Sequence, residues 1–499
     1  MSRFQRVLFV RPFIRDYFNS RSSSSFESSI GLVPPLNLCC LAASVKRAGF
    51  EAAIYDFEAE GSGEEDFVKT LREKQPHVVG ISAITTNFRG ALGTARLVRE
   101  SLPEAVIICG GTHMMIYPRE TMSFDEFDYG FVGEADDSLV SFLKSFDGDA
   151  SGMGSIPGLV RRGKEGIIVN QPFGLNEDLD RLPFPAYELL DLAKYRMPNT
   201  SDNVISLFLS RGCPFKCGFC FRNPLLRRVR FKTVEMAIEE ITYMVERFAV
   251  RSVNFVDETI TLRKRYFMEF CARLKAKNFD LEWQAPTRVD RLDDDIVRAA
   301  KESGCHTLRL GIESGSDEIL ERIGKRTTTR DALEAVRLCK KHGIRTVGYF
   351  IIGYLGETEN TIMQTIRFAK SLGLDYAGFF PATPMPSTRL YDESVRQGLV
   401  PEHYWRDFVL GVRNDPLPFI HPEAETWTAR AYRAFYFSPG HIMRQMRKLG
   451  FYRDFLNNLK VAWRLLTMKF KRAAPGMTPP VHSVTRCPSG SRSERDFLP

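Results

Sequence analysis

Residues 204–221 read Val-Ile-Ser-Leu-Phe-Leu-Ser-Arg-Gly-Cys-Pro-Phe-Lys-Cys-Gly-Phe-Cys-Phe, an apolar run followed at once by three closely spaced cysteines. The apolar run predicts a short buried strand. Cys213, Cys217 and Cys220 then form a Cys-x3-Cys-x2-Cys triplet in the loop after it. Such a triplet supplies three thiolates where a [4Fe-4S] cluster normally takes four, so one iron is left with an open coordination position.

The open iron would give the triplet a chemical function. It can bind S-adenosylmethionine through the amino and carboxylate groups and pass it an electron, which cleaves it to a 5′-deoxyadenosyl radical. The alternatives without radical chemistry are a zinc site and three unrelated buried thiols. Structural zinc takes four ligands, usually from two Cys or Cys/His pairs, and no second pair follows at that spacing. The spacing therefore favours the cluster over zinc.

Length and composition indicate a multidomain globular protein. A chain of 499 residues is too long for one ordinary core and predicts two or three domains. Its apolar stretches are interrupted by charge well before the roughly 20 residues that a membrane-spanning helix requires. Residues 1–12 do not read as a secretory leader. Outside the triplet the cysteines lie mostly in apolar runs, so we expect a reducing, cytoplasmic environment without disulfides.

The positive charge is concentrated near the C-terminus. The net charge is +8, and residues 444–472 hold nine Lys and Arg side chains against the single acid Asp454, which accounts for the whole excess. The remaining chain is electrically balanced. We therefore expect no nucleic-acid partner, and any anionic partner should meet the C-terminal segment.

Strand and helix patterns alternate over residues 1–145. Predicted strands cover 6–10, 52–56, 77–82, 105–109 and 129–132, with predicted helices at 36–48, 65–74 and 88–102. This alternation predicts an α/β domain with a doubly wound parallel sheet, which binds ligands at the C-terminal ends of its strands. The polar and small residues at those ends are Ser82, Thr85, Thr86, Gly110, Gly111, Gly133 and Glu134.

The alternation returns after a Gly- and Pro-punctuated linker at 146–200. Residues 201–395 contain six predicted strands, at 204–209, 252–256, 281–284, 307–310, 346–352 and 375–380. They alternate with predicted helices at 233–248, 263–277, 294–303, 316–323, 330–342 and 358–372. Six such units predict a partial (β/α)6 TIM-like barrel with the cysteines after its first strand, on the catalytic face. A helical, aromatic region is predicted at 396–472, and 473–499 reads as a disordered tail.

Several short motifs occur besides the cysteine triplet. They are Pro34-Pro-Leu-Asn-Leu38, Val79-Gly-Ile-Ser82, Gly110-Gly-Thr-His113, Val132-Gly-Glu134, Asn254-Phe-Val-Asp-Glu258, Arg288-Val-Asp290, Gly311-Ile-Glu-Ser-Gly315 and Phe350-Ile-Ile-Gly-Tyr-Leu-Gly-Glu-Thr358. In this order, with the triplet, the chain resembles the cobalamin-binding-domain radical S-adenosylmethionine (SAM) enzymes. That family includes class B methylases, hopanoid-modifying enzymes and the anaerobic magnesium-protoporphyrin cyclase. The resemblance extends from Val7 to about Leu449.

The resemblance implies that SAM is held at the strand ends of the barrel. Asp257 or Glu258, or the adjoining backbone, would hold the amino group of SAM. Glu313 would accept hydrogen bonds from the ribose hydroxyls or position Arg288. The alternative for each residue is a helix cap or a turn. Two glycines would let the backbone approach the flat adenine closely, namely Gly353 and Gly356.

For the N-terminal domain the resemblance implies a bound cobalamin, and the alternative is a sheet that has lost its ligand. The nucleotide tail of the cobalamin would lie against Ser82, Thr85, Thr86, Gly110 and Gly111, with Gly133 and Glu134 at the neighbouring strand end. The Asp-x-His-x-x-Gly motif that supplies a lower cobalt ligand in some cobalamin proteins is absent from the loop after the first strand. Gln75-Pro-His77-Val-Val-Gly80 is similar but leads into the third strand, so we interpret His77 as structural.

The resemblance also implies a reaction. One SAM would methylate reduced cobalamin, and a second would yield the radical that removes hydrogen from an unactivated carbon of a lipid or secondary-metabolite substrate. That carbon would then take the methyl group. A flavodoxin or ferredoxin would serve as reductant. The alternatives are a radical SAM cyclase or C–C bond-forming enzyme without methyl transfer, and a non-catalytic metal- or corrinoid-binding module.

The C-terminal segment bears on the substrate. Aromatic and leucine residues between 451 and 472 recur near helical spacing, with bases at other positions. This pattern predicts a peripheral contact of 444–472 with an anionic membrane surface, or a solvated helix packed on the barrel. The first reading favours a lipid or lipid-linked substrate.

Overall fold

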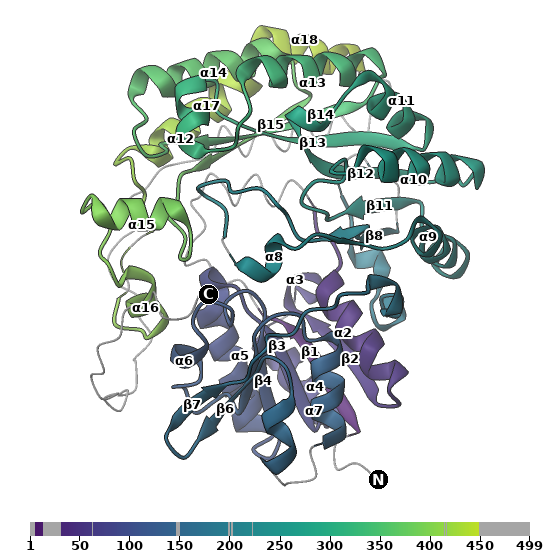
Figure 1. Cartoon of the computed structure of the whole chain (residues 1–499), viewed down its shortest axis with the longest axis vertical. Helices are drawn as coiled ribbons and strands as arrows, with labels where there is room; N and C mark the ends of the chain where they lie inside the picture. The colour runs from purple at the N-terminus through teal and green to yellow at the C-terminus, as the bar shows by residue number, and fades with distance from the viewer. Residues whose placement is uncertain are drawn as a thin grey trace.

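A computed structural model gives the arrangement of two α/β units and a C-terminal helical region (Figure 1). It describes residues 5–12, 31–61, 63–145, 150–197, 200, 203–221, 223–413, 415 and 417–448. The predicted tail and most of the basic amphipathic segment lie outside the described residues. No helix within the described ranges has the length and hydropathy to cross a bilayer.

The first unit is the predicted doubly wound sheet. Five strands run parallel in the order β2-β1-β3-β4-β5. Side chains of β1 alternate between two cores, because Leu8 and Val10 pack on one face of the sheet and Val7 and Phe9 on the other. The strands are β1 (Arg6–Arg11), β2 (Glu51–Asp56), β3 (Val78–Ser82), β4 (Val106–Gly110) and β5 (Tyr129–Phe131). The helices are α2 (Leu36–Arg47), α3 (Phe57–Glu60), α4 (Glu64–Lys74), α5 (Phe88–Ser101), α6 (Pro118–Thr121) and α7 (Asp136–Ser145).

The sheet continues into the segment that the sequence assigns to a linker. Strands β6 (Leu159–Gly163) and β7 (Gly166–Val169) add an antiparallel hairpin beside β5. The sequence pattern missed this hairpin because the strands are short and only Leu159 and Val160 are buried in it. The first sheet therefore has seven strands and extends beyond residue 145.

The second unit is the predicted partial barrel of six parallel strands, in the order β8-β11-β12-β13-β14-β15. Figure 1 shows its helices on the outside of the strands, above the first unit. The strands are β8 (Val204–Leu207), β11 (Ser252–Phe255), β12 (Glu282–Arg288), β13 (Cys305–Glu313), β14 (Arg345–Ile352) and β15 (Tyr376–Pro381). The helices are α9 (Val234–Phe248), α10 (Lys264–Ala276), α11 (Asp294–Glu302), α12 (Asp317–Ile323), α13 (Thr329–Lys341) and α14 (Glu359–Leu372).

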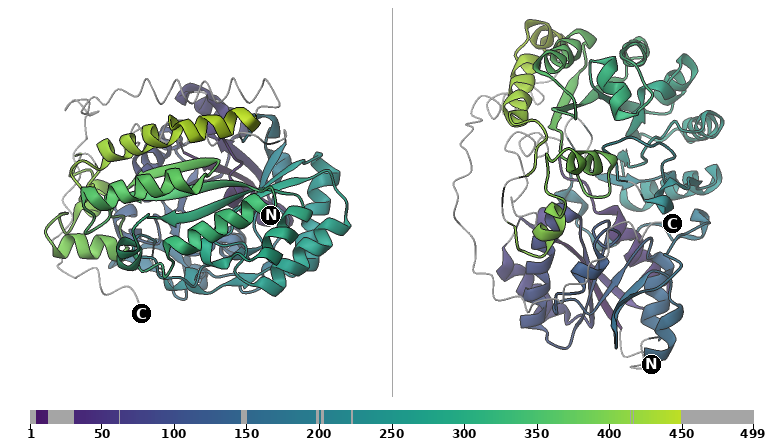
Figure 2. Two further views of the ribbon diagram at one scale, coloured as in Figure 1. Left: turned by 90° about the horizontal axis from the view of Figure 1, so that it is seen from above. Right: turned by 60° about the vertical axis from the view of Figure 1, so that its left-hand side comes forward.

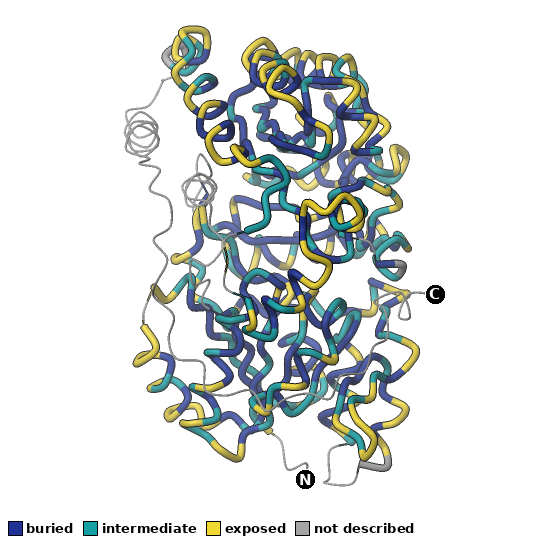
Figure 3. Tube along the Cα trace, turned by 90° about the vertical axis from the view of Figure 1, so that its left-hand side faces the viewer, coloured by how far each residue is buried: buried dark blue, intermediate teal, exposed yellow. Residues whose placement is uncertain are grey.

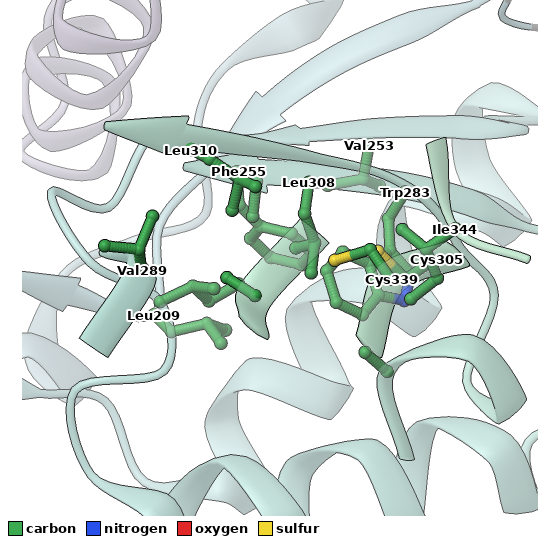
Figure 4. Close-up of a cluster of buried hydrophobic side chains, with 14 of the residues drawn as sticks. Leu209, Val253, Phe255, Trp283, Val289, Cys305, Leu308, Leu310, Cys339 and Ile344 are labelled. Carbon is green, nitrogen blue, oxygen red and sulfur yellow. The ribbon is translucent and has the colours of Figure 1, made fainter. Parts of the chain in front are cut away.

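The barrel core lies between the strands and these helices. Trp283 and Phe255 pack edge to face there, with ring centroids 5.6 Å apart (Figure 4). Alternate strand positions carry polar side chains that bond one another, because Arg309 Nη1 donates to Asn254 Oδ1 at 2.7 Å and Asn254 Nδ2 donates to Ser206 Oγ at 3.5 Å. Burial agrees with this arrangement, because the strands are buried and the outer surfaces of the helices are exposed (Figure 3).

The C-terminal region connects the two units. Its helices are α15 (Arg389–Arg396), α16 (Tyr404–Val409), α17 (Ala424–Tyr436) and α18 (Pro439–Lys448), and Figure 2 shows α17 and α18 along one side of the barrel. The hydroxyls of Tyr432 and Tyr436 accept hydrogen bonds from backbone N–H groups of β15, which covers the edge strand of the barrel. Helix α16 instead packs on the first unit, where the Arg89 guanidinium lies 4.2 Å from the Phe408 ring.

Candidate functional site

The three cysteines lie on one loop, residues 212–229, which we call the cysteine loop. Two short strands, β9 (Ser210–Arg211) and β10 (Arg230–Phe231), pair antiparallel and close its base. Gly212 has φ +99°, and a Cβ there would lie 2.4 Å from the carbonyl oxygen of Arg228, so the turn requires glycine. Cys213 and Cys217 are half-buried and Cys220 is exposed. Partial desolvation raises the pKa of each thiol, and for Cys220 the neighbouring thiols Cys217 and Cys213 raise it further, to about 11.

The middle of the cysteine loop is fixed by backbone contacts to two helices. The N–H of Gly218 donates to the carbonyl of Ile323 at the end of α12, and its carbonyl accepts from the N–H of Leu390 in α15. A Cβ at Gly218 would lie 2.5 Å from the hydroxyl oxygen of Tyr354. The backbone at Gly218 is thus pressed against α12 and α15 with no room for a side chain there.

A buried guanidinium contacts one of the thiols. Arg288 Nη1 donates to Cys217 Sγ at 3.8 Å, and the guanidinium lies 3.8 Å from the Phe215 ring centroid. Its other N–H groups are held by Asp290, at 2.8 and 3.1 Å, and by the carbonyl of Lys325 at 2.6 Å. These bonds leave the Nη1 group directed at the sulfur. The positive charges of Lys325 and Arg288 lower the pKa of Cys217 against the larger effect of burial.

The donor set fits an iron–sulfur cluster. Three thiols stand on one loop, and a fixed N–H donor points at one sulfur, which is the kind of contact that tunes such clusters. Within the described part of the chain, no three Cys, His, Asp or Glu side chains form a group that could hold a metal ion. A single metal ion needs its ligands gathered around one point, whereas a [4Fe-4S] cluster takes the three thiolates on three separate irons.

Asp257 and Glu258 follow β11, but their side chains differ in their surroundings. Asp257 is buried, and its carboxylate accepts from the N–H of Leu209, the N–H of Ser210 at 2.7 Å and the Ser210 hydroxyl at 2.6 Å. These bonds tie β11 to the segment that begins the cysteine loop. Glu258 instead is an exposed residue that lines a cavity described below, and desolvation raises the pKa of its carboxyl.

Glu313 stands at the end of β13 in a strained conformation. It has φ +67°, which is uncommon for a residue with a side chain. Its carboxylate is buried and paired with Lys325, whose Nζ also donates to the carbonyl of Gly311 at 2.8 Å. Glu313 therefore reaches Arg288 only through Lys325, a residue that sequence reasoning did not single out.

Gly353 and Gly356 both adopt left-handed backbone conformations, with φ +79° and +82°. The turn that contains them is held by Glu357, whose Oε2 accepts from the N–H groups of Gly353 and Tyr354 at 2.6 and 3.0 Å. Its Oε1 is buried with no hydrogen-bond partner among the described residues. Burial raises the pKa of Glu357 to about 7. The Gly-Glu-Thr run at 356–358 was the available sequence signal for this residue.

A cavity of about 600 Å³ lies between the two units. It is lined on one side by C-terminal strand ends of the first sheet and on the other by the start of the cysteine loop and the ends of β8 and β11. The first side contributes Ser82, Gly110, Gly111, Gly133 and Glu134, and the second Phe208, Ser210, Arg211, Gly212, Leu226, Val256 and Glu258. The sequence-predicted cobalamin and SAM residues are thus partly brought together at one cavity.

The other predicted residues do not line this cavity. Thr85 is buried, with its hydroxyl 3.3 Å from His113 Nδ1, and Thr86 is absent from the lining. Asp257 bonds the segment that begins the cysteine loop, Arg288 contacts Cys217, and Glu313 is paired with Lys325. Gly353 and Gly356 lie in the turn held by Glu357. A second cavity, of about 270 Å³, is lined by Arg251 and His306 with others near the N-terminal ends of the barrel strands, and it contains none of the predicted site residues.

Gly110, Gly111 and Gly133 line one edge of the large cavity, which we call the glycine edge. This edge fits a ligand that approaches the backbone. At Gly110 a Cβ would meet nothing within 4 Å, so the cavity reaches the main chain there. Gly111 and Gly133 have φ +94° and +96°, and a Cβ on either would lie within 2.4 Å of a carbonyl oxygen. A bulky planar cofactor can approach the main chain at Gly110 because no side chain intervenes there, whereas Gly111 and Gly133 are required by the close approach of the neighbouring backbone. These residues therefore fit the corrinoid implied by the sequence resemblance.

Comparison with known proteins agrees with this geometry. The radical SAM superfamily is matched by residues 207–369, which hold the cysteine loop and most of the barrel. The B12 binding domain is matched by residues 27–143, which hold the parallel strands β2 to β5 but not β1. The cavity lies where these two matched regions meet.

Two relatives and one solved structure resemble nearly the whole chain. An uncharacterized methyltransferase, PH0819 of Pyrococcus horikoshii, is 32% identical over 85% of this chain and 93% of its own length. The anaerobic magnesium-protoporphyrin IX monomethyl ester cyclase of Cereibacter sphaeroides is 26% identical over 90% of this chain and 73% of its own length. The cobalamin-dependent S-adenosylmethionine radical enzyme OxsB, solved with aqua-cobalamin and S-adenosylmethionine bound, has the same fold, with a TM-score of 0.65 at 16% identity over 93% of this chain and 72% of OxsB.

Glu357→Gln should change how stability depends on pH. The folded chain holds the Glu357 proton up to about pH 7, whereas an unfolded chain loses it near pH 4.5. Raising the pH through this window therefore destabilises the wild type relative to the variant, by an amount on the order of 3 kcal/mol. Urea unfolding of both proteins at pH 5 and pH 7.5 measures the difference, and a difference that does not change with pH would contradict the buried carboxyl.

Proposed function

Because the chain belongs to the radical SAM superfamily and carries a B12 binding domain, we propose that it transfers a methyl group to an unactivated carbon of a small-molecule substrate. One observation supports this most directly. The cavity between the two units is lined both by the strand ends of the B12 binding domain and by the start of the cysteine loop. A substrate placed there can face both cofactor sites at once.

The chemistry needs three bound groups. A [4Fe-4S] cluster, S-adenosylmethionine and cobalamin, when bound, supply one-electron cleavage of SAM to a 5′-deoxyadenosyl radical and a carrier for the methyl group. Cys213, Cys217 and Cys220 would hold the cluster, and the glycine edge at Gly110 and Gly133 would hold the corrinoid. A low-potential donor such as flavodoxin or ferredoxin would supply the electron.

The residues around the cysteine loop would bind and orient SAM. Glu258 is the acidic side chain at the end of β11 that lines the cavity, so we propose it for the amino group of SAM. Asp257 would act indirectly, because its oxygens already hold the start of the cysteine loop. Glu313 would meet the ribose with Lys325 beside it, and Glu357 would keep the turn at Gly353 open for the adenine.

The apolar part of the cavity would protect the reaction. Phe208, Leu226 and Val256 face it from the barrel side. Apolar walls exclude water and leave a substrate C–H bond as the group nearest to a primary radical. We infer an apolar substrate portion at this wall, as in a lipid or a secondary metabolite.

Radical cyclisation without methyl transfer is the second candidate. It is favoured by the match to the anaerobic cyclase, which spans 90% of this chain. Both reactions need the cysteine loop and SAM, so the site residues near the loop do not separate them. They differ in whether the methyl group of SAM appears in the product.

Anaerobic incubation of reconstituted protein with methyl-labelled SAM tests the proposal. We expect iron and a corrinoid in the loaded protein, and label in the product in addition to released 5′-deoxyadenosine. A Cys213→Ala, Cys217→Ala, Cys220→Ala variant should release no 5′-deoxyadenosine. Cleavage of SAM with a modified but unlabelled product would support the cyclase instead, and no cleavage by the wild type would leave only a binding module.

Arg288→Gln should lower the reduction potential of the cluster. The variant loses both the positive charge and the N–H donor at Cys217 Sγ, and both stabilise the more negative reduced cluster. We expect a decrease of roughly 50 mV, with Arg288→Lys in between because it keeps the charge without the fork. Redox titration followed by electron paramagnetic resonance (EPR) measures the potential.

Arg291 offers a matched control for this experiment. Its guanidinium also lies over the Phe215 ring, at 5.4 Å, but it is more exposed and the described residues show no bond from it to a thiol. Arg291→Gln should leave the potential unchanged. Equal potentials in the Arg288→Gln variant and the wild type would contradict a role for the Arg288 contact.

A further inference from the structure

The base of the cysteine loop is bound to the first unit by a buried ion pair. Arg230 in β10 forms a two-pronged contact with Glu134, with Nη1 to Oε2 and Nη2 to Oε1 both at 2.8 Å. The side chains are only 5% and 13% exposed. Arg230 Nη1 also donates to the carbonyl of Asn176. The fork therefore fixes the direction as well as the distance of the contact.

A second pair crosses the same interface beside the first. Arg211 in β9 lies 3.1 Å from Asp136 and 3.4 Å from Glu134. Asn176 connects the two acids, because its N–H donates to Glu134 Oε2 at 2.8 Å and its Nδ2 donates to Asp136 Oδ2 at 2.7 Å. We call Glu134, Asp136, Arg211 and Arg230 the interdomain ion-pair cluster.

The position of the interdomain ion-pair cluster links it to both cofactor sites. Arg211 and Arg230 face each other across the β9–β10 pairing, so they hold both ends of the cysteine loop, and Cys213 follows Arg211 by two residues. Glu134 directly follows Gly133 at the glycine edge of the cavity, and Asp136 begins α7. Glu134, Asp136 and Arg211 themselves line the cavity.

Stability alone does not explain charges at this interface. Removing two ions from water costs several kcal/mol each, and well-packed apolar side chains often replace such a pair without loss of stability. Apolar contacts are not directional, however, whereas a forked guanidinium–carboxylate pair accepts one geometry. The Arg211 guanidinium is oriented further by the Phe208 ring, whose centroid lies 4.7 Å away.

We propose that the interdomain ion-pair cluster consists of positioning residues that hold the cysteine loop at one fixed distance from the cobalamin site. This rests on the proposed function. Radical formation and methyl transfer then act on the same substrate carbon, because the interdomain ion-pair cluster holds the two sites in one rigid arrangement. The sequence predicts Glu134 as a cobalamin contact. In this proposal it would instead position the cysteine loop, since both its carboxylate oxygens are already bonded to Arg230.

We expect SAM cleavage and product formation to become uncoupled when the interdomain ion-pair cluster is lost. SAM cleavage needs only the cysteine loop and its surroundings, and the β9–β10 backbone pairing and the Gly218 contacts hold the loop's own shape without the ion pairs. Product formation needs both sites in register. A misplacement of about 1 Å can cost about a hundredfold in rate. Loss of the cluster should therefore lower methylated product by tenfold or more, while 5′-deoxyadenosine release stays within about twofold of the wild type.

The test uses the full-length, cofactor-loaded protein with the double variant Glu134→Gln/Arg230→Gln. Both charges are removed together, so neither is left buried without a counter-charge. The first measurement is the ratio of 5′-deoxyadenosine to methylated product. The second is the distance distribution between the reduced [4Fe-4S] cluster and cob(II)alamin by pulsed EPR. We expect the ratio to rise at least tenfold and the distribution to broaden.

An exposed pair at the same interface is the matched control. Arg228, also at the base of the cysteine loop, pairs with Glu177 in the connecting segment, but their side chains are 64% and 51% exposed. Arg228→Gln/Glu177→Gln should leave the ratio and the distribution unchanged. Arg230→Lys, which keeps the charge but not the fork, should restore part of the coupling if the double variant folds poorly.

An unchanged ratio in the double variant, or an unchanged distance distribution, overturns the proposal. Equal effects of the exposed and buried pairs also overturn it, because that result assigns the effect to charge alone. The distance measurement requires bound cofactors but no turnover. It therefore tests whether the interdomain ion-pair cluster fixes the distance between the two cofactor sites, even if the product proves to be cyclised instead of methylated. In that case only the proposed function fails.

Discussion

The polarity of parallel strands is the constraint on which the site depends. All strands of a parallel sheet end on the same side, so each unit has one edge where its loops gather. In this chain the two edges face each other across the 600 Å³ cavity, with Gly110 and Gly133 on one side and Ser210 and Glu258 on the other. Neither unit alone encloses that space. The chemistry therefore depends on how the units are joined as much as on the residues within each.

Charged side chains around the cysteine loop are mostly engaged with one another. Lys325 neutralises Glu313 and, through its carbonyl, holds Arg288, which in turn contacts Cys217. Such a chain of bonds fixes rotamers that would otherwise be free and keeps charged groups in defined places before any ligand binds. Preorganisation of this kind lowers the cost of placing a reactive ligand in one geometry. The strained backbone at Glu313 is consistent with a turn held by its surroundings.

The sequence predicted the two units because their patterns are local. The parallel strands of both sheets occur where the sequence pattern predicts them, and the cysteine spacing identified the loop that would hold the cluster. Three features had no local signal. The hairpin β6–β7 is short and half-exposed, β9 and β10 have two residues each, and the partners of Arg230 lie 54 and 96 residues away in sequence. Contacts of that separation arise from the meeting of two folded units, which periodicity does not encode.

An acid at a strand end has two physical uses that sequence alone does not separate. It can face a ligand, or it can accept hydrogen bonds from the next loop and hold that loop in place. Glu258 lines the cavity, whereas its neighbour Asp257 is buried against the N–H groups of Leu209 and Ser210. Both residues lie past the end of β11, so the loop that follows the strand, and not the strand pleat, sets which way each side chain points. A motif that pairs two acids therefore supplies one group for the cavity and one for the scaffold that positions the cysteine loop.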